Sequence, residues 1–385
     1  MRNFTPEQHI FRQSYREFLE RDIQPHMPKW REDGVVDRAA FQKAGELGFL
    51  MLWPEEKYGG MGETDFRYEQ IIIEEAARAG CLEFFATLHS RLVGPYLQHF
   101  GNEEQRQRFL PKAVSGESIL AIAMTEPDAG SDLPGMRTTL LPEGNHFILN
   151  GSKTYISNGL NADVIVVAAR SNPDNPRQMT LCLVERGMEG FSRGEKLKKM
   201  GLKAQDTAEL FFDQVKIPAE NILGEVGKGY VYLKKGLAEE RLISACMSAS
   251  NARKAFDITR EFVMNRKAFG RTVADFQHTQ FTMANLDAEL DMLQAYIDHC
   301  VVLLNNDQLD EVSGAKIKLM ATEIEWRVMD AGVQLHGGAG YMEEYEICRL
   351  FTDARVNRIY AGTSEIMKLI IGRHIFSPAY ESPIW

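Results

Sequence analysis

The chain has 385 residues, of which 44% are hydrophobic and 25% are charged, a balance typical of a globular protein with two or three packed units. Its net charge of -10 and its pI near 5.5 argue against general binding to nucleic acids or anionic membranes, because both need a basic surface. The longest apolar runs, such as 164–169, are too short to cross a bilayer. We therefore expect neither a nucleic-acid partner nor insertion into a membrane.

The cysteines and the start of the chain indicate a reducing compartment. Five cysteines are scattered without a CxxC pair, which fits free thiols better than a disulfide framework. The first residues, "MRNFTPEQHIFRQSYREFLERDI", are amphipathic and carry acids, without the apolar centre of a signal peptide. We expect a cytoplasmic protein, or one of an organelle matrix if a transit peptide has been removed.

The predicted elements change in character twice along the chain. Up to about 119, apolar residues recur at helical spacing, as in "FRYEQIIIEEAARAG" and "EEQRQRFLPKAVSG". From about 120 to 225, short β-rich runs follow one another, among them "ADVIVVAAR", "MTLCLVE" and "TAELFFDQVKIP". Long helical patterns then return, in "GYVYLKKGLAEERLISACMSASNARKAFDITREFVMNRKAF" and "TQFTMANLDAELDMLQAYIDHCVVLLNN". The order predicts an α+β protein with an N-terminal helical domain (1–119), a middle β domain (120–225) and a C-terminal helical bundle (226–385).

One β-rich run alternates clearly enough to predict its two faces. The first face takes Thr207, Glu209, Phe211, Asp213 and Val215, and the second takes Ala208, Leu210 and Phe212. Because successive strand residues point to opposite sides, we expect a sheet with one face better covered than the other.

Several common chemistries have no motif in this sequence. We find no HExxH or paired Cys/His spacing for a metal, no GxSxG turn and no GxxxxGK[ST] loop. The stretch "QLHGGAGY" contains GxG, but a helical pattern precedes it, which argues against a dinucleotide fingerprint. Taken alone, its His336 is better interpreted as a structural residue than as a ligand. We predict no metal site.

Five motifs, in register along nearly the whole chain, resemble the acyl-CoA dehydrogenase family. They are "AMTEPDAGSD" (123–132), "NGSKTYISNG" (150–159), "RKAFGR" (266–271), "QLHGGAGYMEEY" (334–345) and "DARVNRIYAGTSEIM" (353–367). Two further stretches, "KMGLKAQDTAELFF" and "EERLISA", resemble the long-chain type of this family. The resemblance implies N-terminal helices, a middle β-barrel or sheet domain and a C-terminal four-helix bundle.

The resemblance also implies a cofactor, a reaction and partners. These are bound FAD, the α,β-dehydrogenation of an acyl-CoA thioester in fatty-acid β-oxidation, and electron transfer to an electron-transfer flavoprotein. In this reaction the α-carbon loses a proton while the β-hydrogen leaves as hydride to the flavin. The family usually forms homotetramers, so we expect a homo-oligomer.

Matching positions imply which residues meet the flavin ring and the substrate. Met124, Thr125, Tyr155 and Ser157 match residues at the isoalloxazine, and Ser131 matches one at the CoA thioester arm. The family usually has Trp and Thr where this chain has Tyr155 and Ser157, so these two residues keep an aromatic face and a hydroxyl.

Other matching positions imply contacts with the rest of FAD. Residues for its phosphates and adenosine come from a neighbouring subunit in the family; here they are Arg266, Phe269, Gln277, Gln334, Gly337 and Gly338. An arginine offers a fixed fork for phosphate, and glycines allow close backbone approach. Thr363 and Glu365 match a stretch that meets the flavin again, with Glu365 in place of a common Gln.

The catalytic base is the largest departure from the common family pattern. Most members carry a glutamate where this chain has Ala361, and alanine has no proton acceptor. The isovaleryl and long-chain types carry the base on a bundle helix, directly before an arginine, and here these residues are Glu240 and Arg241. Ala361 keeps its backbone N–H, which in the family donates to the thioester carbonyl, with Gly362 beside it at the substrate.

Helical spacing supports Glu240 independently of the resemblance. Leu233, Leu237, Glu240, Ser244 and Met247 fall on one helical stripe, whereas Glu239 lies about 100° away. A carboxylate on an apolar stripe faces the interior, where desolvation raises its pKa and makes it a stronger base. The alternative is an ordinary surface glutamate in a Glu-Glu-Arg run.

Several functions stay open on the sequence alone. Our main prediction is a dehydrogenase for medium-to-long acyl chains, methyl-branched ones included. The alternatives are an isovaleryl-type or citronellyl-type enzyme for short branched chains, a flavin monooxygenase of the same fold and an inactive binding paralogue.

Overall fold

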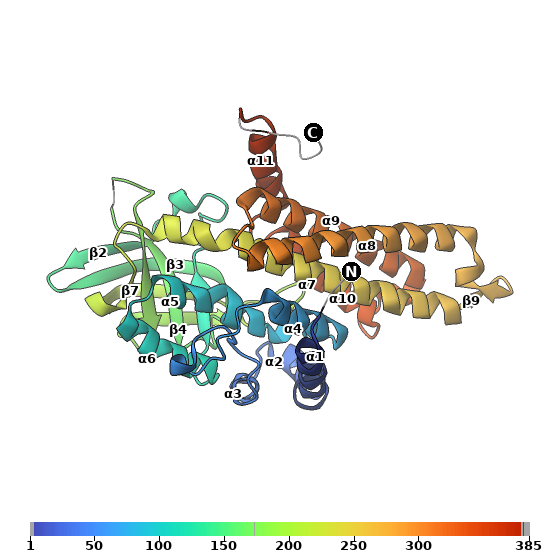
Figure 1. Cartoon of the computed structure of the whole chain (residues 1–385), viewed down its shortest axis with the longest axis horizontal. Helices are drawn as coiled ribbons and strands as arrows, with labels where there is room; N and C mark the ends of the chain where they lie inside the picture. Colours follow the sequence, from blue (N-terminus) through green and yellow to red (C-terminus); the bar gives the residue numbers. More distant parts are fainter. Residues whose placement is uncertain (1–3, 173, 379, 381–385) are drawn as a thin grey trace.

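The computed structural model describes residues 4–172, 174–378 and 380, and it begins with a layer of short helices (Figure 1). Thr5 and Asn102 cap the first and last of these helices through capping boxes with Gln8 and Gln105. The α-helices are α1 (Pro6–Phe18), α2 (Met27–Asp33), α3 (Arg38–Glu46), α4 (Phe66–Arg78), α5 (Gly94–Phe100) and α6 (Glu103–Val114). Between them lie the π-helices η1 (Leu19–Ile23) and η5 (Leu88–Val93) and the 3-10 helices η2 (Gln24–His26), η3 (Glu56–Tyr58) and η4 (Leu82–Phe84).

The middle of the chain forms one eight-stranded sheet. Its strands are β1 (Leu120–Ala123), β2 (Thr139–Glu143), β3 (His146–Ser157), β4 (Val164–Arg170), β5 (Met179–Glu185), β6 (Phe191–Lys196), β7 (Thr207–Pro218) and β8 (Ile222–Leu223). Their order is β6-β7-β3-β2-β4-β5-β8, with β1 added in parallel to β4. β4 and β5 are buried along almost their whole length, because one of their faces packs against the helical core and the other packs against further strands of the same sheet.

The last part of the chain is a bundle of long helices. Its α-helices are α7 (Gly229–Asn265), α8 (Gln277–Asn305), α9 (Glu311–His336), α10 (Glu346–Ala354) and α11 (Ser364–Ile375). A small hairpin of β9 (Lys267–Ala268) and β10 (Arg271–Thr272) joins α7 to α8. α7 packs along α9, and the hairpin lies at the end of the molecule opposite the sheet (Figure 1). In the described part of the chain, no helix combines the length and the apolar character needed to cross a bilayer.

One predicted strand face differs from the structure at its two ends, because Thr207 and Val215 are both buried. In β7, Ala208, Leu210 and Phe212 are buried and Phe211 and Asp213 are exposed, as the alternation predicts, but Val215 is fully buried. The cause is a β-bulge at Gln214, which has a φ of 52° and lies where the register with β3 shifts. Because a bulge inserts one extra residue, the alternation inverts beyond it.

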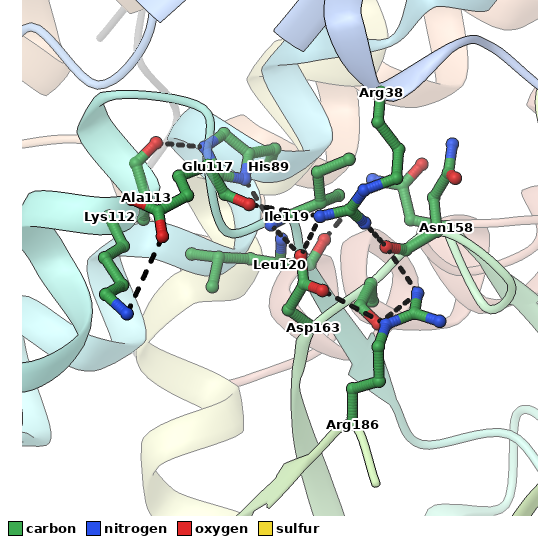
Figure 2. Close-up of polar contacts among 12 residues, drawn as sticks. Arg38, His89, Lys112, Ala113, Glu117, Ile119, Leu120, Asn158, Asp163 and Arg186 are labelled. Atoms are coloured by element: carbon green, nitrogen blue, oxygen red, sulfur yellow. Dashed lines mark hydrogen bonds and ion pairs between the residues drawn. The ribbon is translucent and has the colours of Figure 1, made fainter. Parts of the chain in front are cut away.

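A polar network fixes the N-terminal helices to the start of β1 (Figure 2). Arg38 from α3 pairs with Asp163 at 2.7 Å, and Asp163 also accepts a hydrogen bond from the Ile119 N–H at 2.8 Å. Burial lowers the pKa of His89 to about 4, so this imidazole is neutral; it bonds the Ala113 carbonyl and accepts from the Leu120 N–H. These contacts hold the strand that leads into Met124 and Thr125.

Candidate functional site

The segment after β1 lies against β3 and is held there by backbone and side-chain bonds. The Thr154 N–H donates to the Thr125 carbonyl at 2.9 Å, and the Lys153 ammonium donates to the Met124 carbonyl at 3.0 Å. Lys153 is fully buried and pairs with the 5%-exposed Glu126 at 2.7 Å. A buried pair of this kind fixes geometry, because moving either charge would leave the other unpaired.

A bulge in β3 turns Tyr155 outward beside this segment. Tyr155 has a φ of 59° at a register shift between Lys153 and Ile156, and its side chain is 70% exposed. Among the described residues, no group hydrogen-bonds the hydroxyls of Thr125, Tyr155 or Ser157. An exposed aromatic face beside free hydroxyls is a surface on which a flat, polar ring can lie.

The two neighbouring glutamates of α7 have different surroundings. Glu239 forms an ion pair with Arg91 from η5. No described side chain forms a hydrogen bond or ion pair with Glu240, which is half-buried. Burial raises the pKa of the Glu240 carboxyl, and the nearby charges of Arg241 and Lys318 oppose that shift. Glu240 is therefore a desolvated carboxylate without a hydrogen-bond or ion-pair partner among the described side chains, and the two nearby cations offset only part of the effect of burial on its pKa.

The stripe around Glu240 lies inside the molecule as its spacing predicts. Leu233, Ser244 and Met247 are buried, and Leu237 is half-buried. Arg241 is also buried; its guanidinium donates to the Glu311 carbonyl at 3.3 Å, while its Nε and the Ser244 hydroxyl find no protein partner. Buried polar atoms without partners are costly, so this region is ready to hydrogen-bond a polar ligand.

The turn that contains Ala361 adopts an unusual backbone conformation. Ala361 and Gly362 have φ values of 52° and 88°, and the turn ends at Thr363, which caps α11 by accepting from the Ile366 N–H at 3.3 Å. Within the described residues, the Ala361 N–H has no acceptor. The fully buried Lys318 of α9 donates to the Gly362 carbonyl at 2.7 Å.

A second group of predicted residues gathers at the far end of the bundle. Arg266 and His336 line one open pocket together with Tyr345. His336 has a structural contact there, because its Nδ1 bonds the Gly332 carbonyl at 2.7 Å. Phe269 is 96% exposed, and side chains added at Gly337 or Gly338 would meet only open space. Gln277 and Gln334 are exposed at the same end.

The remaining predicted residues lie at the surface. Ser131 follows β1 in an exposed loop, and Glu365 is exposed in the first turn of α11. The pKa of the Glu365 carboxyl is lowered by its own backbone N–H and by the Thr363 hydroxyl.

The residues that could contact FAD form two separate groups. The Thr125, Tyr155 and Ser157 surface suits a flavin ring, and the exposed Arg266 guanidinium, which forms no ion pair with a described residue, suits a phosphate. However, Glu240 and Arg266 are 26 positions apart on α7 (266 − 240), which is about 39 Å of helix. The sheet lies beside the opposite end of that helix (Figure 1). The two groups of residues therefore belong to different parts of the molecule.

The sequence interpretation missed Lys318 and the Lys153–Glu126 pair. Lys318 lies on a buried stripe of α9 with Ala315, Thr322 and Glu325, at spacings of three and four. A lysine at this spacing among small residues is a signal of burial that could have been found. Lys153 gave no such signal, because its partner Glu126 is 27 positions away and on another segment. Within the described residues, no cluster of His, Cys, Asp or Glu could hold a metal ion.

Models of one family match three consecutive parts of the chain. They are the N-terminal domain (residues 5–117), the middle domain (121–215) and the C-terminal domain (227–376) of acyl-CoA dehydrogenases. The chain therefore belongs to the acyl-CoA dehydrogenase family, whose members are FAD-dependent oxidoreductases acting on the CH–CH bond of acyl-CoA. The family and the fold predicted from the sequence are confirmed.

The relatives distinguish between types within the family. A long-chain specific acyl-CoA dehydrogenase of Sus scrofa mitochondria is 45% identical, over 97% of this chain and 87% of the relative. An isovaleryl-CoA dehydrogenase of Pongo abelii is 35% identical, over 96% and 88%. The isovaleryl type is thus more distant, and the main prediction stands over the short branched alternative.

Solved structures agree with this assignment. An acyl-CoA dehydrogenase from Geobacillus kaustophilus has a TM-score of 0.95 and 44% identity, covering 98% of this chain and all of that chain. A complex of an acyl-CoA dehydrogenase with FAD from Bacillus anthracis has a TM-score of 0.89 and 30% identity, covering 96% of this chain and 66% of that chain.

Proposed function

We propose that this chain dehydrogenates medium-to-long acyl-CoA thioesters and that Glu240 removes the α-proton. The observation that carries the proposal is the contrast between two positions. Position 361 holds an alanine with a free N–H, and α7 holds a desolvated, unpartnered carboxylate at Glu240. Together they offer the acceptor and the donor that enolisation of a thioester needs.

The proposed chemistry divides between these two groups. The Glu240 carboxylate takes the α-proton and becomes a neutral acid, while negative charge develops on the thioester oxygen. The Ala361 N–H donates to that oxygen where the charge develops, as an oxyanion-hole donor does. Bound FAD would accept the β-hydrogen as hydride, and the α,β double bond forms. Arg241, Gly362 and Ser131 are proposed to contact the substrate.

The relatives support a medium-to-long substrate. A long-chain specific relative is 45% identical to this chain, whereas an isovaleryl-type relative is 35% identical. A small interior space is lined by Met247, Asn251 and Tyr360, among others, and its volume of about 20 Å³ suits about one water molecule. Met247 and Asn251 continue the face of α7 that carries Glu240, and Tyr360 precedes Ala361.

FAD would be held by residues of two chains. Met124, Thr125, Tyr155 and Ser157 of one chain, with its Thr363 and Glu365, are proposed to hold the flavin. The phosphates and adenosine would meet the far-end group of a second chain: Arg266, Phe269, Gln277, Gln334, Gly337 and Gly338. The length of α7 between the two groups supports a homo-oligomer, and we propose a tetramer with an electron-transfer flavoprotein as acceptor. Location in the cytoplasm or an organelle matrix and domain boundaries near 119 and 225 stay predictions.

Anaerobic mixing with acyl-CoAs from butyryl to stearoyl, straight and branched, tests the function. Only a dehydrogenase has its flavin bleached by these ligands in the absence of oxygen, and we expect the fastest bleaching with medium-to-long chains. A monooxygenase or a binding paralogue would bind FAD without being reduced, and absence of bleaching across the series would overturn the proposal.

The same assay tests the role of Glu240. We expect Glu240→Gln to slow bleaching by about 10²–10⁴-fold, equal to about 3–5 kcal/mol of barrier, because Gln cannot accept the proton. The matched control is Glu239→Gln on the same helix turn, which removes a charge paired with Arg91 and should bleach at nearly the wild-type rate. Fast bleaching by Glu240→Gln would rule out Glu240 as the base.

A further inference from the structure

Lys318 is a buried charge that the proposed chemistry does not use. It lies in the first third of α9 with no exposed surface, and its ammonium donates to the Gly362 carbonyl at 2.7 Å. Burying a lysine is unfavourable unless its charge and its hydrogen-bond donors find partners. Its partner here is the carbonyl directly after Ala361.

α9 holds the whole segment around this turn through three of its side chains. Glu325 accepts from the Asn357 amide at 2.7 Å, and Glu323 accepts from Arg358 and from the Ser364 hydroxyl, both at 2.9 Å. The glutamates hold the residues on either side of the turn. Lys318 holds the turn itself, at Gly362, where the φ values of Ala361 and Gly362 are both positive.

Lys318 also lies within electrostatic range of the proposed base, because α9 packs along α7, the helix that carries Glu240. The charged groups that act on it are Glu240 and Arg241 from α7 and Glu323 and Glu325 from its own helix. Besides Lys318 and Arg241, Glu240 faces the buried phenols of Tyr96 and Tyr360. Burial lowers the pKa of Lys318 to about 8, so the ammonium is still mainly protonated at neutral pH. Its positive charge therefore favours the ionised form of Glu240.

We propose that Lys318 is a positioning residue that couples the two halves of the site, holding the Ala361–Gly362 turn while stabilising the Glu240 carboxylate. This inference rests on the proposed function. During proton removal the negative charge leaves Glu240 and develops toward the Ala361 N–H. Because Lys318 contacts the turn and lies near Glu240, the same cation stabilises the negative charge on Glu240 before proton removal and near the Ala361 N–H after it.

The test is the pH dependence of anaerobic bleaching in Lys318→Met. Without the cation the pKa of Glu240 rises, so the pH below which bleaching slows should move upward. The limiting rate should also fall, by about 10- to 100-fold, because a charge-assisted hydrogen bond to the turn is lost. The matched control is Lys316→Met, two residues away and half-exposed on the same helix, which should change neither quantity.

Lys318→Gln keeps the test decisive if the methionine variant does not fold. Its amide can still donate to the Gly362 carbonyl but carries no charge, so we expect the same upward shift with a smaller loss of rate. If the pH midpoint of bleaching in either folded Lys318 variant equals that of Lys316→Met, the inference is overturned. Failure of the proposed function would give a different result: either the wild type would not be bleached, or Glu240→Gln would keep the acid limb of the pH profile of bleaching.

Discussion

Glu239 and Glu240 are adjacent acids whose different environments decide their chemistry. Glu239 forms an ion pair with Arg91 of η5. Glu240 lacks such a partner, and burial raises its pKa. Two glutamates one helical step apart are thus suited to different roles, Glu239 to a structural ion pair and Glu240 to proton transfer.

At the scale of single residues, the sequence could predict that Ala361 and Glu240 are unusual positions, but it could not predict that Lys318 contacts the turn beside them. Ala361 is visibly unable to act as a base, and the stripe through Glu240 points inward, as expected. The role of Lys318 was not predicted, because it depends on the Gly362 carbonyl, which is 44 positions away and is not indicated by any local spacing. Long-range partners of single side chains are set by tertiary packing and leave little signal in the sequence.

The Ala361–Gly362 turn carries the proposed donor, and its conformation can be tested at Gly362. Gly362→Ala places a Cβ in a left-handed conformation, 2.6 Å from the Met367 Cε, which should cost about 1–2 kcal/mol. We expect a lower melting temperature and slower bleaching, with an unchanged pH midpoint because Glu240 and Lys318 keep their charges. Thermal melting and anaerobic mixing measure these quantities.

Gly372→Ala is the matched control for this turn. It lies in α11, where an added Cβ meets only open space, so melting and bleaching should stay at wild-type levels or the melting temperature should rise slightly. Equal behaviour of the two variants would mean that the shape of the turn does not matter to the reaction.

Elements were predictable where local pattern decides them and unpredictable where a bulge intervenes. The helices α4 and α6 and the long helices α7 and α8 follow the apolar spacing of their sequences. The bulges at Tyr155 and Gln214 could not be predicted from such a pattern, because each puts a non-glycine residue at positive φ without any turn signal in the sequence. The first bulge exposes the ring proposed to meet the flavin, so this irregular position matters to function.

The proposed FAD contacts form two groups, one around β1 and β3 and one at the far end of the bundle, which makes a two-chain site testable by complementation. Arg266→Ala should lose FAD and Glu240→Gln should lose proton transfer. After subunit exchange between them, a site with Glu240 from one chain and Arg266 from the other is intact, so bleaching should return. Anaerobic mixing measures the recovery, and native mass spectrometry verifies the exchange.

Arg260→Ala, six residues earlier (266 − 260) and also exposed on α7, is the control and should retain FAD. If mixed oligomers form without any recovery of bleaching, the FAD contacts come from a single chain and the proposed arrangement is wrong.

Hydrogen exchange at the α-carbon tests the central claim most directly, because it isolates the proton step. A 3-thiaacyl-CoA, in which sulfur replaces the β-carbon, can lose the α-proton but cannot lose hydride. In heavy water the wild type should exchange the α-hydrogens of this ligand for deuterium, as measured by mass spectrometry. Glu240→Gln should bind the ligand and leave its α-hydrogens in place, while Glu239→Gln should exchange them at nearly the wild-type rate. Exchange by Glu240→Gln at the wild-type rate would contradict the assignment of Glu240 as the base.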